Sequence, residues 1–128
     1  MISKKNKKLF DTIETLVGKE TVFTGDIVVS ESLRVDGTLI GNIKEAANVI
    51  IGETAKVKGN IKASYVVVDG TVEGNIVATE NIELLSKSKV VGDLTTSILS
   101  INEGAVFKGK SLMVEKEEIT EENSEETI

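Results

Sequence analysis

The stretch Val57-Lys58-Gly59-Asn60-Ile61 decides the fold of this chain, because close copies of it recur along the sequence. Each copy has an apolar residue, any residue, glycine, usually Asn or Asp, and then usually Ile or Leu. The copies centre on Gly25, Gly41, Gly59, Gly74, Gly92 and, in a degraded form, Gly109. Successive glycines lie 15 to 18 residues apart, a period that holds one supersecondary unit. The sequence therefore predicts about six stacked layers.

Apolar and polar residues alternate around each glycine with the period of two that is typical of a strand. A second apolar pair follows each of the first five glycines: Leu33 and Val35, Val49 and Ile51, Val66 and Val68, Ile82 and Leu84, and Leu99 and Ile101. Turn residues such as Asp36-Gly37 and Asp69-Gly70 separate the strands. This pattern predicts an all-β, single-domain parallel β-helix, in which each Ile stacks on the next about 4.8 Å away. A hairpin meander or sandwich explains the alternation but not the fixed period.

The repeated glycine and the Asn or Asp after it have expected structural roles. Without a side chain, the glycine gives space to a bulky apolar neighbour or allows a bend at a corner. The Asn or Asp is expected to form a ladder of side-chain hydrogen bonds along the stack.

Composition excludes several classes of function. The 128 residues include no Cys and no His, which removes thiolate metal sites, the commonest general base and the commonest metal ligand. A net charge of −6 and an aromatic content of 3% argue against nucleic-acid binding. No run of apolar residues is long enough for a membrane span or a secretory signal, so we expect a cytoplasmic protein.

The two ends of the chain differ from its body. We divide it into a basic, amphipathic N-terminal tail (1–13), a β-helix core (14–114) and an acidic, disordered C-terminal tail (115–128). Both tails are expected to be flexible. Leu9, Phe10, Ile13, Leu16 and Val17 recur at helical spacing, and Asp11 and Glu14 are placed as a capping box. The alternative for this region is a solvated arm whose first apolar residues dock on the end of the core.

The Gly-Asn-Ile layers, together with Glu14-Thr15-Leu16-Val17-Gly18 leading into Val22-Phe23-Thr24-Gly25-Asp26-Ile27, resemble the bactofilin family. The resemblance covers roughly residues 14 to 112. It implies a bacterial cytoskeletal protein with a right-handed β-helix that polymerises without nucleotide into non-polar filaments, often at the inner face of the membrane. Such a protein is not an enzyme and needs no cofactor or metal. Its partners are other copies of the chain, an anionic membrane surface and recruited proteins, and it serves as a scaffold in processes such as cell shape.

Other functions have some support in the sequence, namely nucleotide binding, two classes of β-helical enzyme and an adaptor. Gly104-Ala105-Val106-Phe107-Lys108-Gly109-Lys110-Ser111 matches the P-loop pattern, but Gly109 is also the sixth glycine of the ladder, so the stretch is expected to form the sixth layer and bind no nucleotide. Acyltransferases on left-handed β-helices generally use a histidine, which is absent, and polysaccharide lyases need longer groove-building loops. A monomeric or dimeric adaptor that does not form filaments stays open as the alternative.

Two groups of residues are expected to carry the function. The polymer interface is predicted at the uncapped ends of the stack, at Val22, Phe23, Phe107, Leu112, Met113 and Val114. The alternative is that these residues only fill the ends of the core. A membrane-binding tail is predicted from Met1, Ile2, Lys4, Lys5, Lys7, Lys8, Leu9 and Phe10, since lysines and apolar groups together suit an anionic bilayer surface.

Overall fold

Short parallel strands build almost the whole of the described molecule. The structure is a computed structural model, and it describes residues 13–117 and 119. The strands, in chain order, are β1 (Ile13–Val17), β2 (Val22–Thr24), β3 (Ile27–Val28), β4 (Ser32–Val35), β5 (Thr38–Ile40), β6 (Ile43–Glu45), β7 (Asn48–Ile51), β8 (Lys56–Lys58), β9 (Ile61–Val68), β10 (Thr71–Glu73), β11 (Ile76–Leu84), β12 (Lys89–Val91), β13 (Leu94–Ile101), β14 (Val106–Lys108) and β15 (Ser111–Met113).

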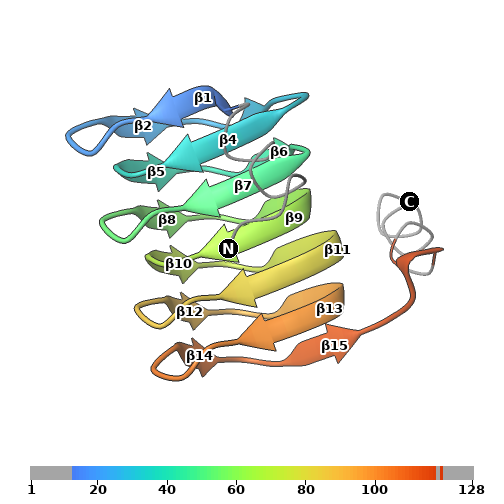
Figure 1. The fold of residues 1–128 in the computed structure, drawn as a ribbon. Helices are drawn as coiled ribbons and strands as arrows, with labels where there is room; N and C mark the ends of the chain where they lie inside the picture. Colours follow the sequence, from blue (N-terminus) through green and yellow to red (C-terminus); the bar gives the residue numbers. More distant parts are fainter. Residues whose placement is uncertain (1–12, 118, 120–128) are drawn as a thin grey trace.

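The strands coil into a solenoid of about six turns, stacked one above another in Figure 1. Each turn has three faces. The first face contains β1, β4, β7 and the later parts of β9, β11 and β13; the second contains β2, β5, β8, β10, β12 and β14; the third contains β3, β6, β15 and the earlier parts of β9, β11 and β13. Every pairing is parallel and joins neighbouring turns, so the predicted β-helix is confirmed and the meander is wrong.

The core consists of columns of apolar side chains that run along the solenoid axis. Ile27, Ile43, Ile61, Ile76 and Leu94 lie in register on the third face, and all are buried. The pairs that include Leu33 and Val35 form two further columns on the first face. The predicted stacking of Ile on Ile is thus confirmed, and it follows from the two-residue alternation of a strand.

A glycine makes the corner between the second and third faces in every turn. Gly41, Gly59 and Gly74 have φ of 149°, 151° and 153°, which side chains rarely adopt. A Cβ on Gly59 would lie 1.9 Å from the carbonyl oxygen of Gly41 in the preceding turn. The expected bend is therefore present. The expectation that a bulky apolar side chain fills this space is wrong, since the backbone of the preceding turn occupies it.

The residue after each glycine ties one turn to the next. The side-chain oxygen of Asn42 accepts the backbone N–H of Asn60 at 2.8 Å, and that of Asn60 accepts the N–H of Asn75 at 2.9 Å. Asp26 and Asp93 make the same contact at the two ends of the column. The predicted ladder is present, and its donors are backbone N–H groups, because each turn places its N–H directly over the oxygen of the preceding turn.

Most of the variation in glycine spacing arises because the corner between the first and second faces has two lengths. Asp36-Gly37 and Asp69-Gly70 turn the corner in two residues, whereas 52–55 and 85–88 need four. A Cβ on Gly37 would lie 2.2 Å from the Gly18 oxygen, and one on Gly70 would lie 2.3 Å from the Gly52 oxygen. A tight corner therefore alternates with a wider one through the first five turns, and the similar layers are not identical.

The N-terminal helical interpretation is wrong for residues 13–17, which form strand β1. Thr15 and Val17 pair with Leu33 and Val35 of β4, and Val17 is buried. The pairing supplies β1 with backbone hydrogen bonds from the second turn, which outweighs a helical spacing of apolar residues. The rest of the predicted capping and membrane-binding segment, residues 1–12, lies outside the described residues, as do 118 and 120–128.

Candidate functional site

The two ends of the solenoid are the candidate site, because the outermost strands there have only one neighbour among the described residues. At the N-terminal end these strands are β1, β2 and β3, and at the C-terminal end they are β14, β15 and the later part of β13. Among the described strands in Figure 1, none covers either end of the stack. Such edges present unpaired N–H and C=O groups, which pair readily with another strand.

Both ends of one apolar column carry a phenylalanine. On the second face, Phe23 and Phe107 enclose four fully buried residues in register: Leu39, Val57, Val72 and Val90. Phe23 is 38% exposed, and Phe107 is half-buried against the core. Each ring is therefore an apolar group at an open end of the stack.

The other predicted interface residues separate into end-facing and outward-facing groups. Met113 pairs with the buried Thr96, so it lies in an inward column that ends at the open C-terminal turn, and it is 58% exposed. Leu112 pairs with Thr95 in an outward column of the third face, and Val22 pairs with Thr38 in an outward column of the second face. Strand alternation thus puts Val22 and Leu112 on the flanks rather than on the cross-section.

Ile101 is an end-facing residue that the predicted interface omitted. It closes the column of Val35, Ile51, Val68 and Leu84 on the first face, and it is 46% exposed because no described strand pairs with it on its outer side. The sequence contained the signal, since Leu99 and Ile101 are the last of the repeated apolar pairs.

After β15, residues 114–117 leave along the side of the stack rather than across its C-terminal end (Figure 1). The Val114 N–H donates to the Thr96 carbonyl at 3.1 Å, in the fifth turn. Lys116 forms an ion pair with Glu80, nearer the middle of the stack, and the hydrogen bond and charge of Glu80 raise the pKa of Lys116. Lys116, Glu117 and the buried Ile119 are helical. The predicted interface residue Val114 therefore belongs to this side segment.

The P-loop-like stretch is part of the sixth turn, as predicted. Val106–Lys108 is strand β14, Gly109 makes the corner with a φ of 151°, and Ser111 begins β15. The Lys110 N–H donates to the Asp93 carboxylate at 3.2 Å, so the negative group it contacts belongs to the preceding turn. A phosphate-binding loop would instead open a helix with its N–H groups pointing into the loop.

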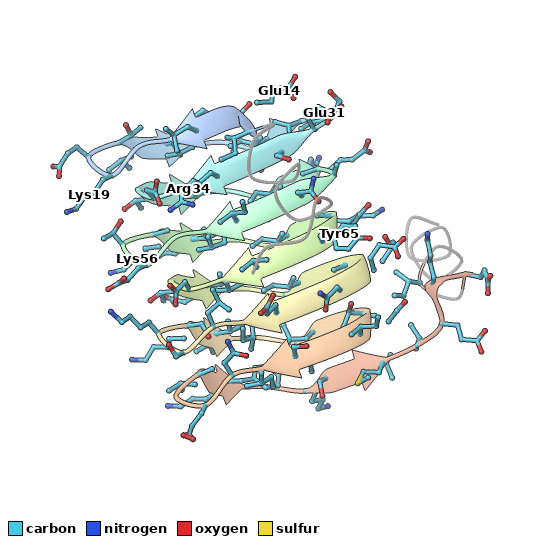
Figure 2. All side chains as sticks on the ribbon, viewed as in Figure 1. Glu14, Lys19, Glu31, Arg34, Lys56 and Tyr65 are labelled. Atoms are coloured by element: carbon cyan, nitrogen blue, oxygen red, sulfur yellow. The ribbon has the colours of Figure 1, made fainter. Side chains whose placement is uncertain are left out.

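Among the described residues, no cluster of three or more acidic, Cys or His side chains is placed to hold a metal ion. In the same part of the chain, no helix has the length and apolar character that crossing a bilayer requires. Figure 2 shows charged side chains such as Lys19, Arg34 and Lys56 projecting outward from the ribbon.

These features define a class of protein: a parallel β-solenoid whose inner strands are paired on both sides and whose outermost described strands are paired on one side only. The model of the bactofilin family, described as polymer-forming cytoskeletal, matches residues 15–112, and the chain belongs to this family. The structure is also similar to bactofilin double helical filaments of Thermus thermophilus reconstructed by cryo-EM, with a TM-score of 0.72 and 27% identity. That match covers 78% of this chain and 99% of the other. The search of curated proteins found no match.

Proposed function

We propose that this chain is a bacterial cytoskeletal protein that assembles without nucleotide into non-polar filaments, through end-to-end contacts between solenoids. The open ends carry the proposal. Each combines strands that lack a second neighbour with exposed apolar residues at the ends of core columns, Phe23 at one end and Phe107, Ile101 and Met113 at the other. Membership of a polymer-forming cytoskeletal family supports the same function. A monomeric or dimeric adaptor is the alternative.

Lys110 favours contacts between like ends over head-to-tail stacking. Within the chain, each Asn or Asp oxygen accepts the N–H of the following turn. In head-to-tail stacking, the Asp26 N–H of one copy would lie over the Lys110 side chain of the next. A lysine side chain has no hydrogen-bond acceptor, so the ladder would be interrupted there. A contact between two C-terminal ends does not have to continue this ladder. Two-fold contacts at both ends, in alternation, give an open filament with no polarity.

The first test is electron microscopy of the purified protein in nucleotide-free buffer, with Phe107→Arg as the key variant. A charge in a desolvated contact costs about 3 kcal/mol or more, and each 1.4 kcal/mol is about tenfold in an equilibrium constant. We therefore expect the critical concentration for assembly to rise by roughly a hundredfold or more. The control Thr95→Arg adds the same charge on the flank and should leave filaments intact. Circular dichroism checks that both variants retain their β-structure.

Wild-type protein that stays monomeric or dimeric at high concentration would favour the adaptor. Phe107→Arg protein that still pellets as filaments would show that Phe107 lies outside the contact.

Filament polarity is tested by cross-linking, because the chain contains no cysteine of its own. Ser111→Cys places one thiol at the C-terminal end, and Thr15→Cys places one at the N-terminal end. With a short thiol-specific cross-linker, we expect covalent dimers from filaments of either variant by itself, because like ends meet at both contacts. Dimers that appear only when the two variants are mixed would establish head-to-tail stacking instead.

We also propose that residues 1–12 attach the filament to the inner face of the membrane, where it scaffolds recruited proteins. The segment contains Met1, Ile2, Leu9 and Phe10 together with Lys4, Lys5, Lys7 and Lys8. Each lysine near an anionic surface contributes about 1 kcal/mol. One such segment binds weakly, but a filament presents many in a row, and avidity multiplies their effect. Liposome co-sedimentation tests this proposal.

A further inference from the structure

The outer side of the second face is a flat surface made of two columns of side chains. Each of its six strands has three residues, of which the central one points into the core and the outer two point away from it. From the first turn to the sixth, one outward column reads Val22, Thr38, Lys56, Thr71, Lys89 and Val106. The other reads Thr24, Ile40, Lys58, Glu73, Val91 and Lys108.

The apolar and charged residues of these columns are arranged symmetrically about the middle of the stack. Val22 and Val106, at opposite ends of one column, are 65% and 40% exposed. Ile40 and Val91, in the second and fifth turns of the other, are 43% and 45% exposed. Lys58 and Glu73 occupy the two central turns. Among the described residues, no ion pair within the chain involves Lys58 or Glu73.

We propose that this face pairs with the same face of a second copy in antiparallel orientation, and that this contact joins filaments side by side. The inference rests on the proposed filament. A two-fold axis parallel to the strands, between the third and fourth turns, brings each turn opposite its symmetric counterpart. The resulting pairs are Val22 with Val106, Ile40 with Val91, Lys58 with Glu73, Lys56 with Thr71, Thr38 with Lys89, and Thr24 with Lys108.

Charge favours this arrangement over the parallel one. In the antiparallel pair, Lys58 and Glu73 of both copies form a square of alternating charges, and no lysine faces another lysine. A two-fold axis along the solenoid would keep the turns level and exchange the two columns. It would set Lys56 of each copy against Lys58 of the other, and like charges across a contact are unfavourable.

The size of the face explains why pairing requires a filament. Three residues per strand and six turns give a surface of about 10 Å by 29 Å, or roughly 300 Å² per copy. A stable pair of proteins usually buries about 800 Å² on each partner. One solenoid therefore pairs weakly, whereas two filaments repeat the contact along their length and bind by avidity.

The net charge of the face gives pairing a characteristic salt dependence. Lys56, Lys58, Lys89 and Lys108 outnumber Glu73, so the two faces repel each other at long range. Salt shortens this repulsion to about 10 Å at 0.1 M, while the apolar pairs are unaffected. Lateral pairing should therefore increase as salt rises from low concentration. Binding of the same face to an anionic membrane would decrease, which separates the two partners.

The test is a charge reversal and its rescue, scored by electron microscopy as the fraction of filaments that run in pairs. Glu73→Lys should convert paired filaments to single ones, because both central ion pairs become repulsive. The double variant Lys58→Glu with Glu73→Lys restores the alternating square, and pairing should return. Ile40→Thr, which keeps the outward position β-branched, should also reduce pairing. The control Glu83→Lys makes the same charge change in the outward column of the first face and should leave pairing unchanged.

Each result decides between the proposals. Absence of any filament would overturn the proposed function and this inference with it. Wild-type filaments that are only single, or pairs that persist in Glu73→Lys, would overturn the lateral contact while the filament stands. A Glu73→Lys variant that binds anionic liposomes more strongly, in filaments whose pairing does not change, would assign the face to the membrane.

Discussion

Replacing the corner glycine Gly59 by alanine should be among the most damaging small substitutions in the chain. An ordinary contact of a Cβ lies at 3.4–4 Å, whereas the Cβ on Gly59 would lie 1.9 Å from the Gly41 oxygen. The third turn must therefore move away from the second by about 1.5 Å to restore van der Waals contact.

This movement breaks the hydrogen bonds that join the two corners. The Gly41 N–H to Lys58 oxygen, Ile43 N–H to Asn60 oxygen and Asn60 N–H to Asn42 side-chain distances are 3.0, 2.8 and 2.8 Å. Each contributes about 1 kcal/mol net, and the unfavourable φ adds about 1–3 kcal/mol. The expected loss of roughly 4–6 kcal/mol is a large part of the 5–15 kcal/mol that stabilises a typical domain.

Alanine substitutions at two other glycines distinguish the cost of the steric clash from the cost of the unfavourable φ. Gly25 has a φ of 135°, but among the described residues a Cβ there meets the Phe23 ring at 3.6 Å and no backbone of a preceding turn. Gly25→Ala should therefore lose only the strain, about 1–3 kcal/mol. At Gly18 the nearest atom is the Thr21 hydroxyl at 3.8 Å, and Gly18→Ala should be close to neutral.

The assay is urea denaturation followed by circular dichroism, on filament-depleted protein at low concentration. The free energy of unfolding should fall in the order Gly18→Ala, Gly25→Ala, Gly59→Ala. Equal losses for Gly25→Ala and Gly59→Ala would refute the clash between turns as the reason for the glycine.

Two further predictions concern nucleotide and membrane. Lys110→Ala should leave assembly unchanged with and without ATP, because Lys110 contributes its backbone N–H to Asp93 and that bond survives; saturable ATP binding that the variant loses would contradict this. Deleting residues 1–12 should leave filaments intact but release them from anionic liposomes, and salt should weaken wild-type binding because the lysine attraction is screened. Truncated filaments that still co-sediment, above a self-pelleting control, would place the membrane contact elsewhere.

The repeat made the fold predictable, because a period near 17 residues with Gly-Asn-Ile at its centre leaves few other architectures. The group that packs against each corner glycine could not be predicted, since it depends on the distance between the backbones of two successive turns. The helical prediction fails at residues 13–17 because apolar residues at 13, 16 and 17 fit a helix as well as a strand. Pairing with β4 decides the matter, and pairing is a non-local property.

The sequence predicts which residues lie at the ends of the stack better than it predicts where their side chains point. Phe23 and Phe107 were correctly placed at the two ends of the stack, while their function as a polymer contact stays a prediction. Val22 was grouped with Phe23, although the alternation that revealed the strands also puts these neighbours on opposite sides. Residues 114–117 run beside the stack, where Val114 bonds to Thr96 and Lys116 pairs with Glu80, and no local sequence pattern predicts these contacts.

The sideways departure of the chain after Met113 has a consequence for what a filament displays. Because this segment climbs the flank toward Glu80, the described chain leaves the end of the stack at its side, away from the axis of assembly. Six turns of about 4.8 Å give a length of roughly 29 Å per subunit. Neighbouring solenoids point in opposite directions in the proposed non-polar filament, so the flank segments recur in a pattern that repeats every two subunits, about 58 Å. Such a filament would hold attached cargo along its side in this pattern while both growing tips stay accessible.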